Sequence, residues 1–307
     1  MSDEPEASVH RSSLIAHRSW TRLPPVNERR LGILYIVGAA LLWSTGGIGV
    51  KGVDDAPLKI TFYRSVFAAV TLFLIFRRDV RVRPSPSFLA AIVSYGACLT
   101  SFVVATKWTT AANAIFLQYA GVVWVLLLSP LVLREPMRSR DAIAIGSALT
   151  GMALFFLGRF ETRGMAGNGM ALLSSVFFAA LVLALRREHA SSRAAVAWGN
   201  VFTAVALFPF VMHDLALTTK SLLAFIFLGV FQIGIAYALF VKGLQYVTAT
   251  QASLTGMLEP VANPIWVLLF IGEKPSVYAI VGAAIVLLAI GWHTLRGEPA
   301  TDMPAPD

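Results

Sequence analysis

Charged residues are scarce in this sequence, and cysteine is almost absent. Asp, Glu, Lys and Arg together make up 14% of the 307 residues, and the one cysteine is Cys98. A single cysteine excludes a secreted scaffold stapled by disulfides. Soluble domains carry roughly 25% charged residues, so this chain lacks the polar side chains that would cover a soluble globule.

The sequence also lacks the motifs of common catalytic and metal sites. It contains no HExxH zinc motif, no GxSxG nucleophile elbow and no Walker loop for ATP. The histidines fall in expected tails, loops or helix ends: His10, His17, His189, His213 and His293. We therefore expect no catalytic residues, no metal and no cofactor, and the chain is predicted not to be an enzyme.

Apolar side chains are what the sequence has in abundance. They make up 57% of the residues, and the mean hydropathy is +0.70. About 20 apolar residues in helical conformation span a hydrocarbon core of ~30 Å, and the absence of period-2 alternation favours helices over a transmembrane barrel. The sequence predicts an all-α membrane protein whose ten spanning helices lie at about 31–50, 58–76, 88–107, 111–133, 141–158, 167–185, 194–212, 221–241, 249–271 and 276–295.

Basic residues fall in the short gaps between these runs, as membrane topology requires, and not on one face of a domain that would bind nucleic acid. Seventeen lie on the side of the N-terminus and seven on the other. This split predicts that residues 1–30 and 296–307 are cytoplasmic tails. The partners of the protein would be the lipid bilayer and a small-molecule substrate.

The two halves of the chain share a weak repeat. Laying 109–135 over 247–273 aligns two Thr-Ala pairs, two alanines and two glutamates, each glutamate with a proline within two residues. We interpret 31–158 and 167–295 as two five-helix repeats. Because each has an odd number of spans, the second would be inverted, as in secondary transporters that bind substrate at the repeat interface.

The residues of the first half carry a family resemblance. The stretch 113–136, NAIFLQYAGVVWVLLLSPLVLREP, resembles the fourth-helix signature of EamA-type exporters in the drug/metabolite transporter superfamily. Trp43 and the run Phe62-Tyr63-Arg64 also match that family. The resemblance implies a basket in which helices 1–4 and 6–9 enclose a central cavity, and the chain is similar to bacterial exporters of amino acids, aromatic ones included. The second half keeps no counterpart of Trp43 or Arg64.

Two charges lie well inside the predicted spans, and such charges are functional candidates by default. Arg64 lies roughly 9 Å from one end of its helix and Glu259 roughly 15 Å from the end of its own. The arginine offers a bidentate partner for a carboxylate, and the glutamate offers a partner for an amine or a proton. A structural ion pair, or Arg64 reaching the outer interface, is the alternative.

Polar side chains on one face of the ninth helix join these charges as candidates, because lipid cannot satisfy them. This face contains Gln251, Thr255, Glu259 and Asn263. Helix–helix hydrogen bonding is the alternative for this face. Deep aromatic and amide side chains complete the predicted substrate-binding set, with packing or a membrane-interface belt as their alternative: Trp43, Tyr63, Tyr95, Gln118, Tyr119, Trp124, Trp198, Asn200, Gln232 and Tyr237.

These features predict a secondary exporter of amino acids or similar metabolites that works by alternating access. An EamA-type exporter of nucleobases, amines or drugs is the nearest alternative. A membrane-embedded enzyme is disfavoured by the missing motifs, and a channel by the missing ring or filter of repeated polar groups.

Overall fold

A computed structural model describes residues 26–81, 85–157, 164–188, 191–271 and 276–295. This part of the chain is helical and contains no strand. Pro57 and Pro86 open α4 and α5, at positions where a missing N–H costs nothing. The helices are α2 (Val26–Trp43), α3 (Gly46–Lys51), α4 (Pro57–Phe76), η2 (Arg77–Val80), α5 (Pro86–Trp108), α6 (Ala111–Gln118), α7 (Ala120–Val132), α8 (Ser139–Phe155), α9 (Met165–Arg187), α10 (Ser192–Val211), α11 (Thr219–Phe227), η3 (Leu228–Ile235), α12 (Ala236–Gly243), α13 (Ala249–Gly256), α14 (Leu258–Ile271) and α15 (Val277–Leu295).

Eight helical segments within the described residues are long and apolar enough to cross a membrane. They are Asn27–Lys51, Pro57–Phe76, Pro86–Trp108, Asn113–Val132, Met165–Arg187, Ser192–Val211, Thr219–Gly243 and Val277–Leu295. The other two expected spans coincide with α8, which has 17 residues, and with the broken pair α13 and α14. A multi-span helical architecture is thus established, and the full count of ten stays a prediction.

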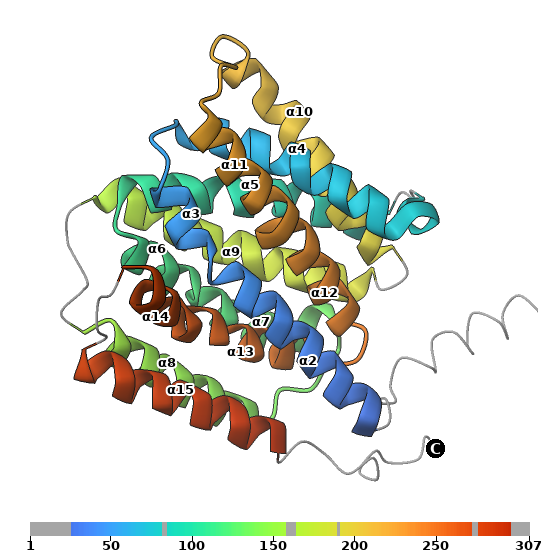
Figure 1. Cartoon of the computed structure of the whole chain (residues 1–307). Coiled ribbons are helices and arrows are strands. Elements are labelled where there is room, and N and C mark those ends of the chain that lie inside the picture. The colour runs from blue at the N-terminus through green and yellow to red at the C-terminus, as the bar shows by residue number, and fades with distance from the viewer. Residues whose placement is uncertain (1–25, 82–84, 158–163, 189–190, 272–275, 296–307) are drawn as a thin grey trace, which may run out of the picture.

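The helices run side by side in one bundle (Figure 1). α5 and α9 pack against each other in its interior, and α2 packs against α12. α8 and α15 contact each other along the lower edge of the view in Figure 1, and α4 packs between α10 and η3. The interior therefore lies between the α5–α9 pair and the α2–α12 pair.

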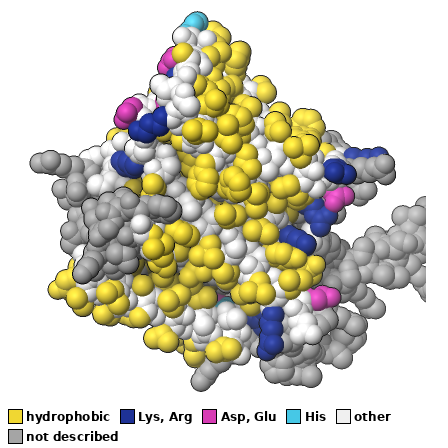
Figure 2. All heavy atoms as spheres, in the orientation of Figure 1, with side chains coloured by type: hydrophobic (Ala, Val, Ile, Leu, Met, Phe, Trp, Pro, Cys, Tyr) yellow, Lys and Arg dark blue, Asp and Glu magenta, His cyan; other side chains and the backbone are white. Residues whose placement is uncertain are grey.

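Apolar side chains also cover the outside of the bundle, which is the arrangement that lipid favours. Leu131 and Leu288 are 78% and 72% exposed. Figure 2 shows apolar side chains across the middle of one face and charged side chains gathered toward its two ends. This banded surface is typical of a protein that crosses a bilayer.

The repeat found in the sequence has a structural equivalent in helix register. α6 begins after Thr110, is eight residues long and breaks at Tyr119, where α7 follows. α13 begins after Thr248, is also eight residues long and breaks at Met257, where α14 follows. The sequence alignment pairs Thr110 with Thr248 and Tyr119 with Met257, so the caps and the breaks of the two halves fall at aligned positions.

Two other interruptions of regular helical hydrogen bonding in the described residues each occur in one half of the chain only. α2 ends at Trp43, where the Ser44 and Thr45 hydroxyls donate to the carbonyls of Leu41 and Leu42 at 2.6 and 2.7 Å. These side-chain hydrogen bonds compete with the backbone hydrogen bonds of the helix. Further along the chain, η3 is a π-helical segment of eight residues, a rare conformation that is frequent at functional sites. By contrast, α5 and α9 are each uninterrupted for 23 residues.

Candidate functional site

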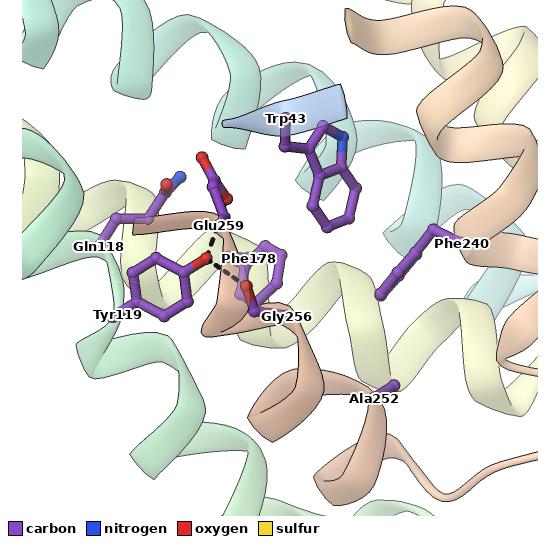
Figure 3. A pocket seen from close by; sticks show the side chains of 8 residues that line it. All are labelled: Trp43, Gln118, Tyr119, Phe178, Phe240, Ala252, Gly256 and Glu259. Carbon is purple, nitrogen blue, oxygen red and sulfur yellow. Dashed lines mark hydrogen bonds between the residues drawn. The ribbon is translucent and has the colours of Figure 1, made fainter. Parts of the chain in front are cut away.

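A pocket lies in the bundle interior where the two helix breaks meet (Figure 3). It encloses about 320 Å³ of space not filled by protein atoms, its open side included. It receives residues from α2, from the end of α6 and the break that follows it, from both sides of the α13–α14 break, from α9 and from α12. Its lining consists of Trp43, Gln118, Tyr119, Phe178, Phe240, Ala252, Gly256 and Glu259.

A hydrogen-bonded triad forms the polar end of this pocket. The Tyr119 hydroxyl lies 2.8 Å from the carbonyl oxygen of Gly256 and 2.9 Å from Oε2 of Glu259. Tyr119 is the break residue of the first half, and Gly256 is the last residue before the break in the second. This contact therefore ties the two breaks to each other.

Aromatic rings form the opposite end of the pocket. The ring centroid of Trp43 lies 5.1 Å from that of Tyr237 and 5.0 Å from that of Phe240. Tyr237 in turn lies 4.8 Å from Tyr95 in an edge-to-face arrangement. Such a chain of rings gives an apolar wall of fixed geometry, suited to the flat or apolar part of a ligand.

Arg64 is buried close to the Tyr95 and Tyr237 rings of this aromatic wall. Its side chain is 1% exposed, and its Nε and Nη1 have no hydrogen-bond partner within the described structure. The groups that act on it electrostatically are Tyr95, Tyr237 and Cys98. A buried cation without a carboxylate partner is costly, so its retention in the bundle needs a reason other than stability.

Arg64 and Glu259 do not pair with each other. The ion pairs of the described residues include neither of them. The structural ion pair considered from the sequence is therefore not formed in this conformation. Arg64 lies close to Tyr95 and Tyr237, whereas the carboxyl group of Glu259 lies in the pocket.

The structure brings four of the predicted site residues into the pocket: Trp43, Gln118, Tyr119 and Glu259. Gln118 donates to the Ser174 hydroxyl of α9 at 2.8 Å. Three more surround Arg64 or its neighbours, namely Tyr95, Asn200 and Tyr237, and the Asn200 amide donates to the Tyr95 hydroxyl at 2.8 Å.

Several predicted site residues lie away from the pocket. The Tyr63 hydroxyl donates to the Leu215 carbonyl, and the Trp198 indole donates to the Val80 carbonyl. Trp124 is 42% exposed and donates to the Ser175 hydroxyl at 3.3 Å. For these three, a role in packing or at the membrane interface accounts for the observed contacts.

The polar face predicted on the ninth helix points only partly into the pocket. Gln251 and Thr255 are buried, and Gln251 accepts a hydrogen bond from Nε of Arg29 at 3.1 Å. Gln232, on η3, is buried next to Gly46 with its Oε1 unpartnered. The side chain of Asn263 lies outside the described part of the structure.

Four lining residues were missing from the predicted set. Ala252, Gly256 and Glu259 follow one another at i, i+4 and i+7 along one helix stripe, so that spacing was available as a signal. The immediate sequence neighbours of Phe178 and Phe240 are apolar, so nothing in the sequence separates these pocket residues from packing residues.

A many-span helical bundle with a pocket between broken helices defines the class of membrane transport proteins. The model of the EamA-like transporter family matches residues 30–157 and again 165–294. The chain belongs to this EamA-like transporter family, which confirms the resemblance seen in the sequence. It is accordingly a transporter and not an enzyme.

Known proteins agree with this assignment. An uncharacterized transporter of Archaeoglobus fulgidus is 28% identical over 269 residues, which cover 86% of this chain and 97% of the relative. Solute carrier family 35 member G1 of Homo sapiens is 24% identical, with coverage of 84% and 77%. A solved crystal structure at 18% identity superposes with a TM-score of 0.77, covering 90% of this chain and all of the other, and shows a shared fold.

Proposed function

We propose that this transporter exports amino acids, aromatic ones among them, across the bacterial inner membrane. It would do so by alternating access between two inverted five-helix repeats, 31–158 and 167–295, with ten spans and cytoplasmic tails at 1–30 and 296–307. The observation that carries the substrate assignment is that Arg64 and Glu259 form no ion pair within the described structure, while aromatic rings lie close to both of them. A zwitterion with an apolar side chain is complementary to that arrangement.

The unpartnered donors of Arg64 support binding of a carboxylate. Charge-assisted hydrogen bonds from a guanidinium to a carboxylate are strong, and two nitrogens of Arg64, Nε and Nη1, have no partner within the described structure. Glu259 supplies the complementary partner for the ammonium group, and Trp43 with Phe240 would contact the side chain. Small aromatic pockets with few polar groups at fixed places are typical of metabolite sites.

The unequal helices of the two repeats support alternating access. In the proposed repeat, α9 is the counterpart of α2–α3 and α5 is the counterpart of α11–α12. The α5–α9 pair is uninterrupted, whereas its counterpart pair contains the Ser44–Thr45 break and the π-helical η3. In an inverted-repeat transporter the two repeats exchange conformations, so an asymmetry of this kind is expected in any single state.

Counterflow in proteoliposomes tests this function. Vesicles loaded with unlabelled phenylalanine are expected to take up labelled phenylalanine, and Arg64→Gln is expected to abolish this uptake. Arg187→Gln, which removes an exposed charge on α9, is the matched control and keeps the activity. Phenethylamine lacks the carboxylate and is expected to compete poorly with phenylalanine. If no amino acid gives counterflow while nucleobases, amines or drugs do, the transporter serves one of those classes instead.

A further inference from the structure

The triad of Tyr119, Gly256 and Glu259 constrains where its hydrogen atoms lie. A phenolic hydroxyl has one hydrogen to donate, and a backbone carbonyl only accepts. Tyr119 is within hydrogen-bonding distance of two oxygens, at 2.8 and 2.9 Å. If Glu259 is ionised, both neighbours are pure acceptors and Tyr119 satisfies only one of them.

Pro260 makes the Gly256 carbonyl the natural recipient of the tyrosine hydrogen. In a continuous helix this carbonyl would accept from the backbone N–H four residues later, and residue 260 is a proline without that group. An unpaired buried carbonyl costs about 1–3 kcal/mol. Tyr119 offsets that cost by donating to Gly256.

With the tyrosine hydrogen on Gly256, the contact with Glu259 forms only if the carboxyl group is the donor. A protonated Glu259 donates to the Tyr119 oxygen, Tyr119 donates to Gly256, and all three groups are satisfied. No cation replaces the proton, because the ion pairs of the described residues do not include Glu259.

The titratable groups around Glu259 supply no positive charge that would neutralise an ionised carboxylate. Tyr119, Tyr237 on α12 and Cys98 on α5 interact with it electrostatically, and each is neutral in its ordinary protonated form. Arg64 on α4 acts on Tyr95, Tyr237 and Cys98 and forms no ion pair with Glu259. The remaining lining of the pocket, from α2, α9 and α13, is uncharged.

We propose that Glu259 carries a proton in this conformation, and that release of this proton weakens the contact between the two helix breaks and thereby couples transport to proton movement. An ionised Glu259 attracts the tyrosine hydrogen more strongly than a neutral carbonyl does. Tyr119 then donates to Glu259 and no longer to Gly256, so one of the two hydrogen bonds that join the α6–α7 break to the α13–α14 break is lost and the Gly256 carbonyl is left unpaired. The proton passes to water on the side to which the pocket is open, and one proton is taken up again on the other side.

The coupling of proton release to transport rests on the proposed function, but the protonation of Glu259 does not. A first experiment therefore tests the protonation without any substrate. Infrared spectra of the purified transporter at neutral pH are expected to contain a carboxylic-acid C=O band that Glu259→Gln removes. Tyr119→Phe leaves the acid in place without its acceptor, so the band shifts and does not vanish. Glu135→Gln, which changes a carboxylate paired with Arg186, leaves it unchanged. Identical spectra for wild type and Glu259→Gln would mean that Glu259 is ionised, and would overturn the proposal.

A second experiment separates coupling from transport itself. Phenylalanine counterflow is measured at equal pH on both sides and again under an imposed pH gradient. The gradient is expected to drive accumulation by the wild type and by Arg187→Gln, and to have no effect on whatever exchange Glu259→Gln retains. Counterflow that ignores the gradient in the wild type would refute the coupling and leave the export function intact. Absence of counterflow with every amino acid would refute the export function, while the infrared result would still decide the protonation of Glu259.

Discussion

Thr110 and Thr248, one in each half of the chain, cap their helices in the same way. Each has an extended backbone, and each hydroxyl accepts a hydrogen bond at 3.1 Å from the backbone N–H three residues later, that of Asn113 or Gln251. An N-cap of this kind stabilises a helix by about 1 kcal/mol. The two caps start two short helices that break after the same number of residues, so both breaks next to the pocket follow from local sequence.

Arg64 is expected to favour function at the expense of stability. Arg64→Met keeps much of the volume and removes a buried charge that has two unpartnered nitrogens. Replacing buried charge by well-packed apolar groups is often stabilising by about 1–4 kcal/mol. We expect a higher melting temperature in detergent together with loss of amino-acid counterflow. A lower melting temperature would show that the guanidinium is a structural element of the bundle.

Two tryptophans of the predicted substrate-binding set are expected to differ sharply in their contribution to transport. Trp43 lines the pocket, whereas Trp124 is 42% exposed and bonded to Ser175. Trp43→Leu is expected to reduce counterflow by about tenfold or more, which corresponds to ~1.4 kcal/mol of lost ring contacts. Trp124→Leu, the matched control, is expected to change it by less than about twofold. If the two variants have equal melting temperatures and lose equal counterflow activity, Trp43 does not contact the substrate.

Gly229 on η3 is a close-packing position. A Cβ atom there would contact the Cβ of Phe67 and lie 2.7 Å from the carbonyl oxygen of Arg64. Gly229→Ala is therefore expected to destabilise the fold by about 1–3 kcal/mol through overpacking. Gly169→Ala, in the open on α9, meets no atom within 4 Å and is expected to stabilise by roughly 0.5–1 kcal/mol. Thermal unfolding of both variants is the measurement, and shifts in the same direction would contradict the packing argument.

Glu135 joins three segments at one end of the bundle. Its carboxylate pairs with Arg186 at 2.9 Å and accepts from the backbone N–H of Ala249 at 3.1 Å, at the start of α13. Arg186 also donates to the Leu244 carbonyl at 2.6 Å. Glu135→Gln is expected to lower stability by about 1–3 kcal/mol, since both partners lose a charge-assisted bond.

A double-mutant cycle checks the coupling between Glu135 and Arg186. If the pair acts as a unit, Glu135→Gln combined with Arg186→Gln costs clearly less than the sum of the two single variants. Additive costs would mean that each residue contributes separately.

Local signals in the sequence predicted much of this molecule. The apolar runs placed the helices, the alignment of 109–135 with 247–273 paired the two segments that the structure shows to be broken, and the membrane-buried charges drew attention to Arg64 and Glu259. The sequence failed where tertiary packing decides. Phe178 and Phe240 are indistinguishable from other apolar side chains until their neighbours are known.

Long-range partners were equally invisible in the sequence. A four-residue period predicted Gln251, Thr255 and Glu259 on one face, whereas the residues that line the pocket are Ala252, Gly256 and Glu259. The bond between Tyr119 and Gly256 links residues 137 positions apart. No periodicity within one helix reports such a bond.

The π-helical η3 also determines the rotational setting of the helix that follows it. A π-turn uses about one more residue than an α-turn before the chain returns to the same side. Tyr237 and Phe240, which bracket Trp43, come directly after this segment. Rewinding η3 into a regular α-helix would turn both rings about the helix axis and away from the indole, without breaking a covalent or ionic contact. The packing of Tyr237 and Phe240 against Trp43 therefore depends on the rotation of α12 about its axis, which the hydrogen-bonding pattern of η3 sets.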